Sequence, residues 1–170
     1  MITLILPGYS PNNREWSEEN SRFLDLEGQI RPIFWDHWTE PEKEFDPKNK
    51  ARILGNISKN LITNIVAKSI GCLVGSYIIR DHPEQIGKVV FCGLPLNDLN
   101  DEEKEVVKDA LKTISPEKII CFQNEDDTHG TFEQVKDVIG KIDSEIRVVS
   151  KNGSDHEYPY YDEFQEFLTT

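Results

Sequence analysis

Short apolar runs alternate with longer amphipathic stretches along the whole chain. The runs Leu4-Ile5-Leu6 and Val89-Val90-Phe91 are continuous, which is typical of strands that are covered on both faces. Between the runs, apolar residues recur at helical spacing, as Ile53 and Ile57 do. The pattern predicts strands at residues 2–6, 29–35, 61–67, 88–92, 118–122 and 145–149. It predicts helices at residues 13–26, 46–59, 70–81, 101–112, 132–142 and 161–168.

The repeated order of strand and then helix determines the expected architecture. Helical crossovers between successive strands produce a parallel sheet with helices on both faces. We therefore expect an α/β fold, a three-layer α/β/α sandwich whose six-stranded parallel sheet has the order 2-1-3-4-5-6. The strand at residues 61–67 then lies near the centre of the sheet. The length of 170 residues fits one domain spanning residues 1–170.

The charge of the chain limits the expected partners. With 31 acidic and 19 basic residues the formal net charge is −12, so the chain repels nucleic-acid backbones and anionic lipid surfaces. We therefore expect no nucleic-acid partner and no membrane association. We expect no signal peptide before the first strand, and no apolar run approaches the ~18 residues of a spanning helix. Cys72, Cys92 and Cys121 are odd in number and unpatterned, which argues against a disulfide framework and favours the reducing cytoplasm.

Polar and chemically reactive side chains follow the predicted strands. Because the carboxyl ends of parallel strands meet at one edge of the sheet, we expect these turns to lie together. They contain a hydroxyl, two carboxylates and an imidazole, in the chain order nucleophile, acid, base. The turns are Gly8-Tyr9-Ser10, Asp36-His37-Trp38, Lys68-Ser69-Ile70-Gly71, Gly93-Leu94-Pro95, and residues 124–129 and 154–157.

The segment around Ser69 resembles the nucleophile elbow of the α/β hydrolases. The family pattern is Gly-x-Ser-x-Gly, in which the residues two before and two after the serine are small because the serine occupies a strained turn. Here Ala67 takes the first small position and Gly71 the second. Further segments resemble the same family in the same order along nearly the whole chain. They are Pro7-Gly8-Tyr9 (the oxyanion loop), residues 82–84 and 93–95, residues 123–127 with the acid, and Gly153-Ser154-Asp155-His156.

The resemblance implies a minimal α/β-hydrolase fold and a catalytic triad. In that triad Ser69 is the nucleophile and His156 the general base. Asp127 is the acid that orients the histidine, with Asp126 as the alternative. The backbone N–H groups of Tyr9 and Ile70 form the oxyanion hole. The side chains that we expect to line the substrate site are Ser10, His37, Trp38, Leu94 and His129, and Lys68 is expected to be exposed.

The expected reaction is hydrolysis of a small or medium ester through an acyl-enzyme on Ser69, with thioester or amide cleavage left open. Residues 94–117, between the fourth and fifth strands, have room for one helix and two loops, so the site should have no lid. No cofactor and no metal is implied, and the oligomeric state is open.

Three alternative functions also fit parts of the sequence. Ala67 departs from the family pattern, so the chain could be a catalytically inactive binding protein on the same scaffold. A metal-dependent hydrolase could use Asp126, Asp127, His129 and His156, although their spacing matches no strong metal motif. A flavodoxin-like nucleotide binder would need a glycine-rich phosphate loop, which Pro7-Gly8-Tyr9-Ser10 lacks.

Overall fold

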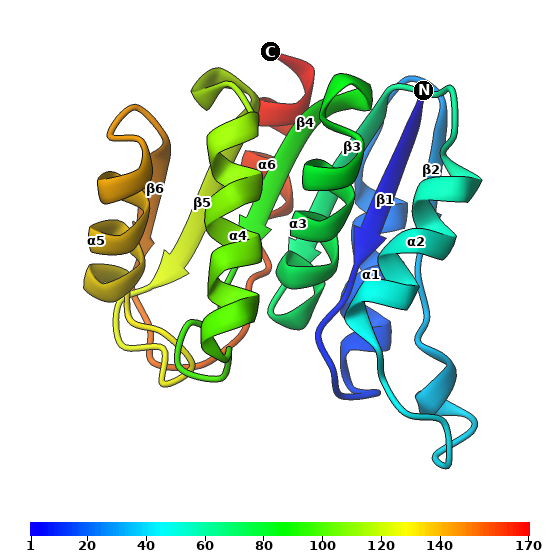
Figure 1. Cartoon of the computed structure of the whole chain (residues 1–170), viewed down its shortest axis with the longest axis horizontal. Helices are drawn as coiled ribbons and strands as arrows, with labels where there is room; N and C mark the ends of the chain where they lie inside the picture. The colour runs from blue at the N-terminus through cyan, green and yellow to red at the C-terminus, as the bar shows by residue number, and fades with distance from the viewer.

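A single parallel sheet forms the centre of the computed structural model, which describes residues 1–170. Its strand order is β2-β1-β3-β4-β5-β6, so the predicted architecture and the predicted order 2-1-3-4-5-6 are confirmed (Figure 1). Strand β3, which Ser69 follows, lies between β1 and β4. The strands are β1 (Ile2–Leu6), β2 (Gln29–Pro32), β3 (Thr63–Lys68), β4 (Ile86–Cys92), β5 (Ile119–Asn124) and β6 (Arg147–Lys151).

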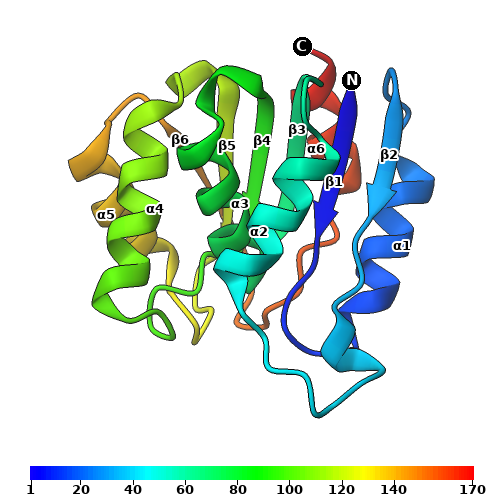
Figure 2. The same ribbon diagram turned by 45° about the vertical axis from the view of Figure 1, so that its right-hand side comes forward.

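The helices cover the two faces of the sheet unequally. The face seen in Figure 1 carries α2, α3, α4 and α5, whereas α1 and α6 lie behind the sheet, as the turned view in Figure 2 also shows. The α-helices are α1 (Asn13–Phe23), α2 (Pro47–Ile57), α3 (Ile70–Asp81), α4 (Asp101–Thr113), α5 (Phe132–Ile142) and α6 (Tyr161–Thr169). Three short 3-10 helices complete the chain: η1 (Asp36–Trp38), η2 (Pro83–Gln85) and η3 (Pro116–Lys118).

Each face of the sheet has its own hydrophobic core. The larger cluster has 31 buried residues and includes Leu4, Leu6 and Ile65. The smaller has 11 and includes Ile5 and Val66 from the same strands. Successive side chains of a strand point to opposite faces, so a strand that is covered on both sides needs a continuous apolar run. This explains why the apolar runs of the sequence identified the strands.

Several element ends differ from the sequence prediction by two to three residues. The second strand ends at Pro32, not at residue 35: the Ile33 N–H still donates to the Ile5 carbonyl, and the chain then leaves the sheet toward η1. The last strand spans Arg147–Lys151, not residues 145–149, since Glu145 is held in a turn by its N–H bond to Asp143. Between β4 and β5 the chain holds α4 and the short η3, as expected for a site without a lid.

None of the helices combines the length and apolar character that crossing a lipid bilayer requires. The three cysteines are free and buried, and burial raises the pKa of each thiol above its ordinary value. These thiols are therefore protonated at neutral pH and are poor nucleophiles.

Candidate active site

Ser69 occupies the turn between β3 and α3 in a strained backbone conformation. Its φ is 57° and its ψ is −126°, and only one other non-glycine residue, Asn60, has a positive φ. Such a conformation costs roughly 1 to 3 kcal/mol and persists only when the surroundings enforce it. The strain places Ser69 where a nucleophile elbow places its serine, at the carboxyl edge of the sheet.

The two flanking positions show why small residues are needed. A Cβ atom at Gly71 would lie 2.2 Å from the Leu6 carbonyl oxygen and 2.9 Å from that of Pro7, so only glycine fits there. Ala67 is fully buried between its register partners on β1 and β4, Leu6 and Phe91. The first small position therefore accepts a methyl group, whereas the second does not.

The close approach at Gly71 also brings the connection that follows β1 against the start of α3. Tyr9 lies in this connection, and its N–H donates to no other group of the chain. Ile70 is the first residue of α3, so its N–H has no acceptor within the helix. Two N–H groups without an acceptor in the chain, those of Tyr9 and Ile70, thus lie on the two segments that the family resemblance implied.

Asp127 and His156 form a tight pair. His156 Nδ1 lies 2.6 Å from Asp127 Oδ2, and the aspartate is fully buried. The same carboxylate accepts the Tyr158 hydroxyl at 2.6 Å and the His129 N–H at 2.9 Å. Burial would raise the pKa of Asp127, but the hydrogen bonds from His156, Tyr158 and His129 outweigh it and hold the pKa below its usual 3.8. Asp127 is therefore ionised at neutral pH.

Asp126 has a different environment. Its side chain is exposed, and its N–H donates to the Gly153 carbonyl. Of the two adjacent carboxylates, the structure brings only Asp127 to the histidine.

Ser69 and His156 both lie against the carboxyl end of β4. Ser69 N–H donates to the Cys92 carbonyl at 2.9 Å, and a Cβ atom at Gly93 would lie 2.9 Å from His156 Cε1. Glycine is required at position 93 for two reasons. Its φ is +59°, which favours glycine, and the His156 ring leaves no room for a Cβ atom. His156 Nε2 is enclosed and has no hydrogen-bond partner, and no hydrogen bond joins it to Ser69 Oγ in this structure.

Two residues that the sequence reasoning missed hold the histidine loop. Asn124, at the end of β5, donates through Nδ2 to the Asp155 and Glu157 carbonyls, at 3.0 Å each, and these carbonyls flank His156. Tyr158 is fully buried and also accepts the Asn124 N–H. In the sequence, the only signal for these roles was the aromatic Tyr158, two positions after the histidine in an otherwise charged loop.

Lys68 is not exposed, so the expectation from its charge was wrong. Its side chain is 3% exposed because β3 is a central strand that is covered on both faces. Its Nζ lies 2.9 Å from Glu157 Oε2, and it approaches the Trp16 ring at 5.9 Å from the centroid. The ion pair ties β3, the strand before Ser69, to the residue that follows His156.

The five expected substrate-lining side chains have different environments. Leu94 is 1% exposed and packs in the larger core cluster, away from any open surface. His37 and Trp38 donate to the Tyr9 carbonyl at 2.9 and 2.7 Å, so both support the loop that carries Tyr9. Ser10 is half-buried, and its hydroxyl accepts the Asn12 N–H.

His129 differs from these because it contacts the triad candidates directly. Its ring centroid lies 4.3 Å from that of His156, and its Nδ1 lies 2.5 Å from Asp98 Oδ2. The structure therefore places His129 at the rim of the Asp127–His156 pair.

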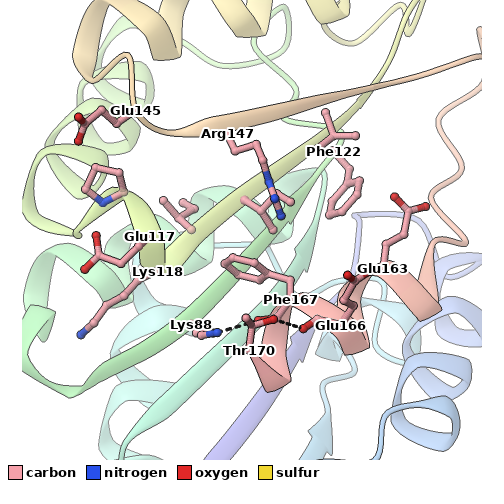
Figure 3. A pocket seen from close by; sticks show the side chains of 14 residues that line it. Lys88, Glu117, Lys118, Phe122, Glu145, Arg147, Glu163, Glu166, Phe167 and Thr170 are labelled. Atoms are coloured by element: carbon pink, nitrogen blue, oxygen red, sulfur yellow. Dashed lines mark hydrogen bonds between the residues drawn. The ribbon is translucent and has the colours of Figure 1, made fainter.

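The three cavities described below do not coincide with this chemistry. Figure 3 shows a cavity of about 960 Å³ beside α6, lined by residues such as Lys88, Arg147 and Phe167 near the amino ends of β4, β5 and β6. Smaller cavities of about 410 and 180 Å³ lie between α4 and α5 and beside Tyr160. Neither Ser69 nor His156 lines any of the three. Cavity size alone assigns no chemistry. No group of three or more His, Cys, Asp or Glu side chains is placed to hold a metal ion.

Comparison with known proteins finds similarity in structure. No family model matches the sequence, and neither does a curated protein. Among solved structures, one described as a YdeN-like hydrolase of Pectobacterium atrosepticum superposes with a TM-score of 0.68 at 15% identity, covering 99% of this chain and 91% of that one. A Bacillus cereus carboxylesterase gives 0.62 at 10% identity, with 99% and 87% covered.

A type II thioesterase of yersiniabactin biosynthesis, YbtT, gives a TM-score of 0.56 at 15% identity, covering 99% of this chain and 89% of that one. At such identities the likeness concerns the fold. The sheet order, the strained serine turn and these superpositions agree, and the chain has the α/β-hydrolase fold.

Proposed function

We propose that this protein is a serine hydrolase that cleaves a small or medium ester through an acyl-enzyme on Ser69. The observation that carries the proposal is the state of the His156 ring. Buried Asp127 holds Nδ1, while Nε2 is enclosed and unpartnered at the strand end where the strained Ser69 turns. An imidazole that is oriented in this way has one nitrogen free to accept a proton from a nucleophile.

The proposed reaction has two halves. His156 Nε2 takes the Ser69 hydroxyl proton as Oγ attacks the ester carbonyl carbon, and the N–H groups of Tyr9 and Ile70 donate to the resulting oxyanion. Collapse of this intermediate breaks the ester C–O bond, and His156 returns its proton to the leaving alcohol. Water then attacks the acyl-enzyme with His156 again as base, which releases the acid and restores Ser69. Asp127 remains ionised and stabilises the imidazolium.

Two features support an ester as the substrate. The connection between β4 and β5 is short and holds no lid domain that would restrict the substrate. Solved structures with this fold include a carboxylesterase and a thioesterase. An alcohol leaves more easily than an amine does, so esters should react faster than amides of the same acid.

One observation favours a second function, a catalytically inactive binding protein on the same scaffold. Ser69 Oγ and His156 share no hydrogen bond in this structure. Catalytic hydrogen bonds are often long before substrate binds and shorten in the complex. A small rotation of the Ser69 side chain is therefore part of the proposal.

Labelling with a fluorophosphonate separates the two functions. Wild-type protein should gain one phosphonyl adduct at neutral pH, and Ser69→Ala should gain none. Ser154→Ala is the matched control, since it removes an exposed hydroxyl in the histidine loop and should label at the wild-type rate. Hydrolysis of p-nitrophenyl butyrate, its thioester and its anilide then ranks the substrate classes. A wild-type protein that stays unlabelled, or a Ser69→Ala variant that still labels, would overturn the enzyme proposal.

A further inference from the structure

The connection between β1 and α1 presents three successive carbonyls to aromatic N–H groups. Trp35 Nε1 donates to the Gly8 carbonyl at 3.0 Å and, more weakly, to the Pro7 carbonyl at 3.3 Å. His37 and Trp38 both donate to the next carbonyl, that of Tyr9. All three donors come from the short segment that follows β2. The loop is therefore held along one side through its carbonyl oxygens.

The geometry of the peptide bond turns this contact into a constraint on Tyr9. The Gly8 carbonyl and the Tyr9 N–H belong to one planar trans peptide unit, so they point in opposite directions. When Trp35 holds the Gly8 oxygen, the Tyr9 N–H must point away from Trp35. That N–H has no acceptor in the chain, and its loop lies against the start of α3 at Gly71.

Packing in the hydrophobic core fixes the position of the Trp35 side chain. It is 2% exposed, belongs to the larger core cluster and meets the Phe45 ring edge-on at 5.3 Å. Packing alone would be satisfied by a phenyl ring, whereas a buried indole N–H requires an acceptor. The early end of β2 at Pro32 lets Trp35 leave the sheet and reach the Gly8 carbonyl.

The opposite side of the loop is closed as well. A Cβ atom at Gly8 would lie 2.8 Å from Asn13 Oδ1, and Asn13 Nδ2 donates to the Ser10 carbonyl at 3.0 Å. The Gly8–Tyr9 peptide is thus confined between Asn13 and Trp35, and the indole N–H sets its orientation.

We infer that Trp35 is a positioning residue for the oxyanion hole, acting through the Gly8 carbonyl on the Tyr9 N–H. The inference rests on the proposed serine hydrolase function, in which Tyr9 N–H stabilises the transition state. Its effect should fall on kcat and leave KM nearly unchanged, because the oxyanion forms only after the ester has bound.

The test compares two identical chemical changes in one loop. Trp35→Phe removes the N–H that holds the Gly8 carbonyl and should lower kcat about 10- to 100-fold, below or near the loss of a whole oxyanion donor. Trp38→Phe removes one of two donors to the Tyr9 carbonyl, which belongs to the next peptide unit. Its loss should be at most about threefold, because His37 still holds that oxygen.

Binding of a transition-state analogue distinguishes positioning from general damage. The affinity for a boronic acid that forms a tetrahedral adduct on Ser69 should fall in Trp35→Phe by the same factor as kcat/KM. Unfolding by urea serves as the check on the fold. If Trp35→Phe does not fold, 3-benzothienylalanine at position 35 keeps the bicyclic shape and removes only the N–H.

The outcomes separate the inference from the function on which it rests. A wild-type protein that does not react with fluorophosphonate overturns the proposed function and the inference with it. A different result is that the wild type reacts with fluorophosphonate while the folded position-35 variant has the same kcat and the same affinity for the boronic acid. That result overturns the inference alone. A loss in Trp38→Phe that matches the loss in Trp35→Phe also overturns it.

Discussion

The acid–base side of the candidate site is held by hydrogen bonds, whereas the nucleophile side is held by backbone strain and close packing. Asp127 accepts three hydrogen bonds, and Asn124 fixes the carbonyls that flank His156. Ser69 has no side-chain hydrogen bond, and a φ of 57° and the lack of space at Gly71 determine its place. The two sides should therefore fail differently. Changes of polarity should disable the first, and changes of volume the second.

The largest effect is expected from a substitution of Asp127, on the acid–base side. Asp127→Asn keeps the shape but replaces an acceptor of the His156 Nδ1–H by an amide, which favours the wrong tautomer. We expect kcat to fall roughly 10,000-fold. Asp126→Asn, the same change in an exposed neighbour, should alter kcat by less than about twofold. Ester turnover of the two variants measures this, and a reversed order would show that Asp126 is the acid.

The nucleophile side, which depends on close packing, is tested at Gly71. Gly71→Ala drives a methyl group to within 2.2 Å of the Leu6 carbonyl, so the backbone of β1 or α3 must move. We expect a loss of about 3 kcal/mol in the free energy of unfolding. Gly140→Ala is the matched control on α5, where no atom lies within 4 Å, and it should stabilise the protein by up to ~1 kcal/mol. Urea unfolding of both variants gives the values, and equal stabilities would refute the packing argument.

The sequence predicted the nucleophile side of the site more fully than the acid–base side. The apolar runs predicted the sheet and its order because strands that are covered on both faces need apolar residues throughout. Ser69 and Gly71 could be found because an elbow is a local, steric feature within five residues. Whether Asp126 or Asp127 pairs with His156 could not be decided, because the choice depends on a contact across 29 positions.

The remaining errors have similar causes. Lys68 was expected to be exposed from its charge, but its place on a central strand buries it, and Glu157, far along the chain, supplies the partner. Asn124 gave no signal at all, because its three acceptors lie more than 30 residues later. Trp35 was assigned to the end of the second strand from the apolar run, whereas its N–H serves the loop after β1.

Asn124→Asp tests whether the hydrogen bonds of the acid–base side act together. The change replaces the donor that holds the carbonyls of Asp155 and Glu157 by a carboxylate oxygen, which repels them. Leaving such groups unpaired in a buried position should cost about 2 kcal/mol in stability and lower kcat at least about tenfold. Asn97→Asp is the control, because its exposed Nδ2 also holds a loop carbonyl, that of Thr128. It should change either quantity only slightly, and an equal loss would remove the special role of Asn124.

The smallest expected effect concerns Tyr158, and its size depends on pH. Burial raises the pKa of the Tyr158 hydroxyl, and the neighbouring Asp127 raises it further, so the hydroxyl stays protonated and donates to Asp127. That bond helps to hold the pKa of Asp127 below 3.8. A carboxyl with a lowered pKa in the folded state stabilises the fold at higher pH, and this contribution is lost as pH falls through the folded-state pKa. Tyr158→Phe should therefore lose about 1 kcal/mol at pH ~7 and less at pH ~3.

Tyr160→Phe supplies the control that isolates this pH dependence. Its hydroxyl donates to Asn124 Oδ1, an amide oxygen that does not titrate, so its loss should cost a similar amount at both pH values. Urea unfolding of wild type, Tyr158→Phe and Tyr160→Phe at the two pH values measures the differences. The difference between wild type and Tyr158→Phe should narrow in acid, whereas that for Tyr160→Phe should stay constant. If both differences stay constant, the Tyr158 hydroxyl is not coupled to the charge of Asp127, and the acid–base side of the site is less cooperative than its geometry suggests.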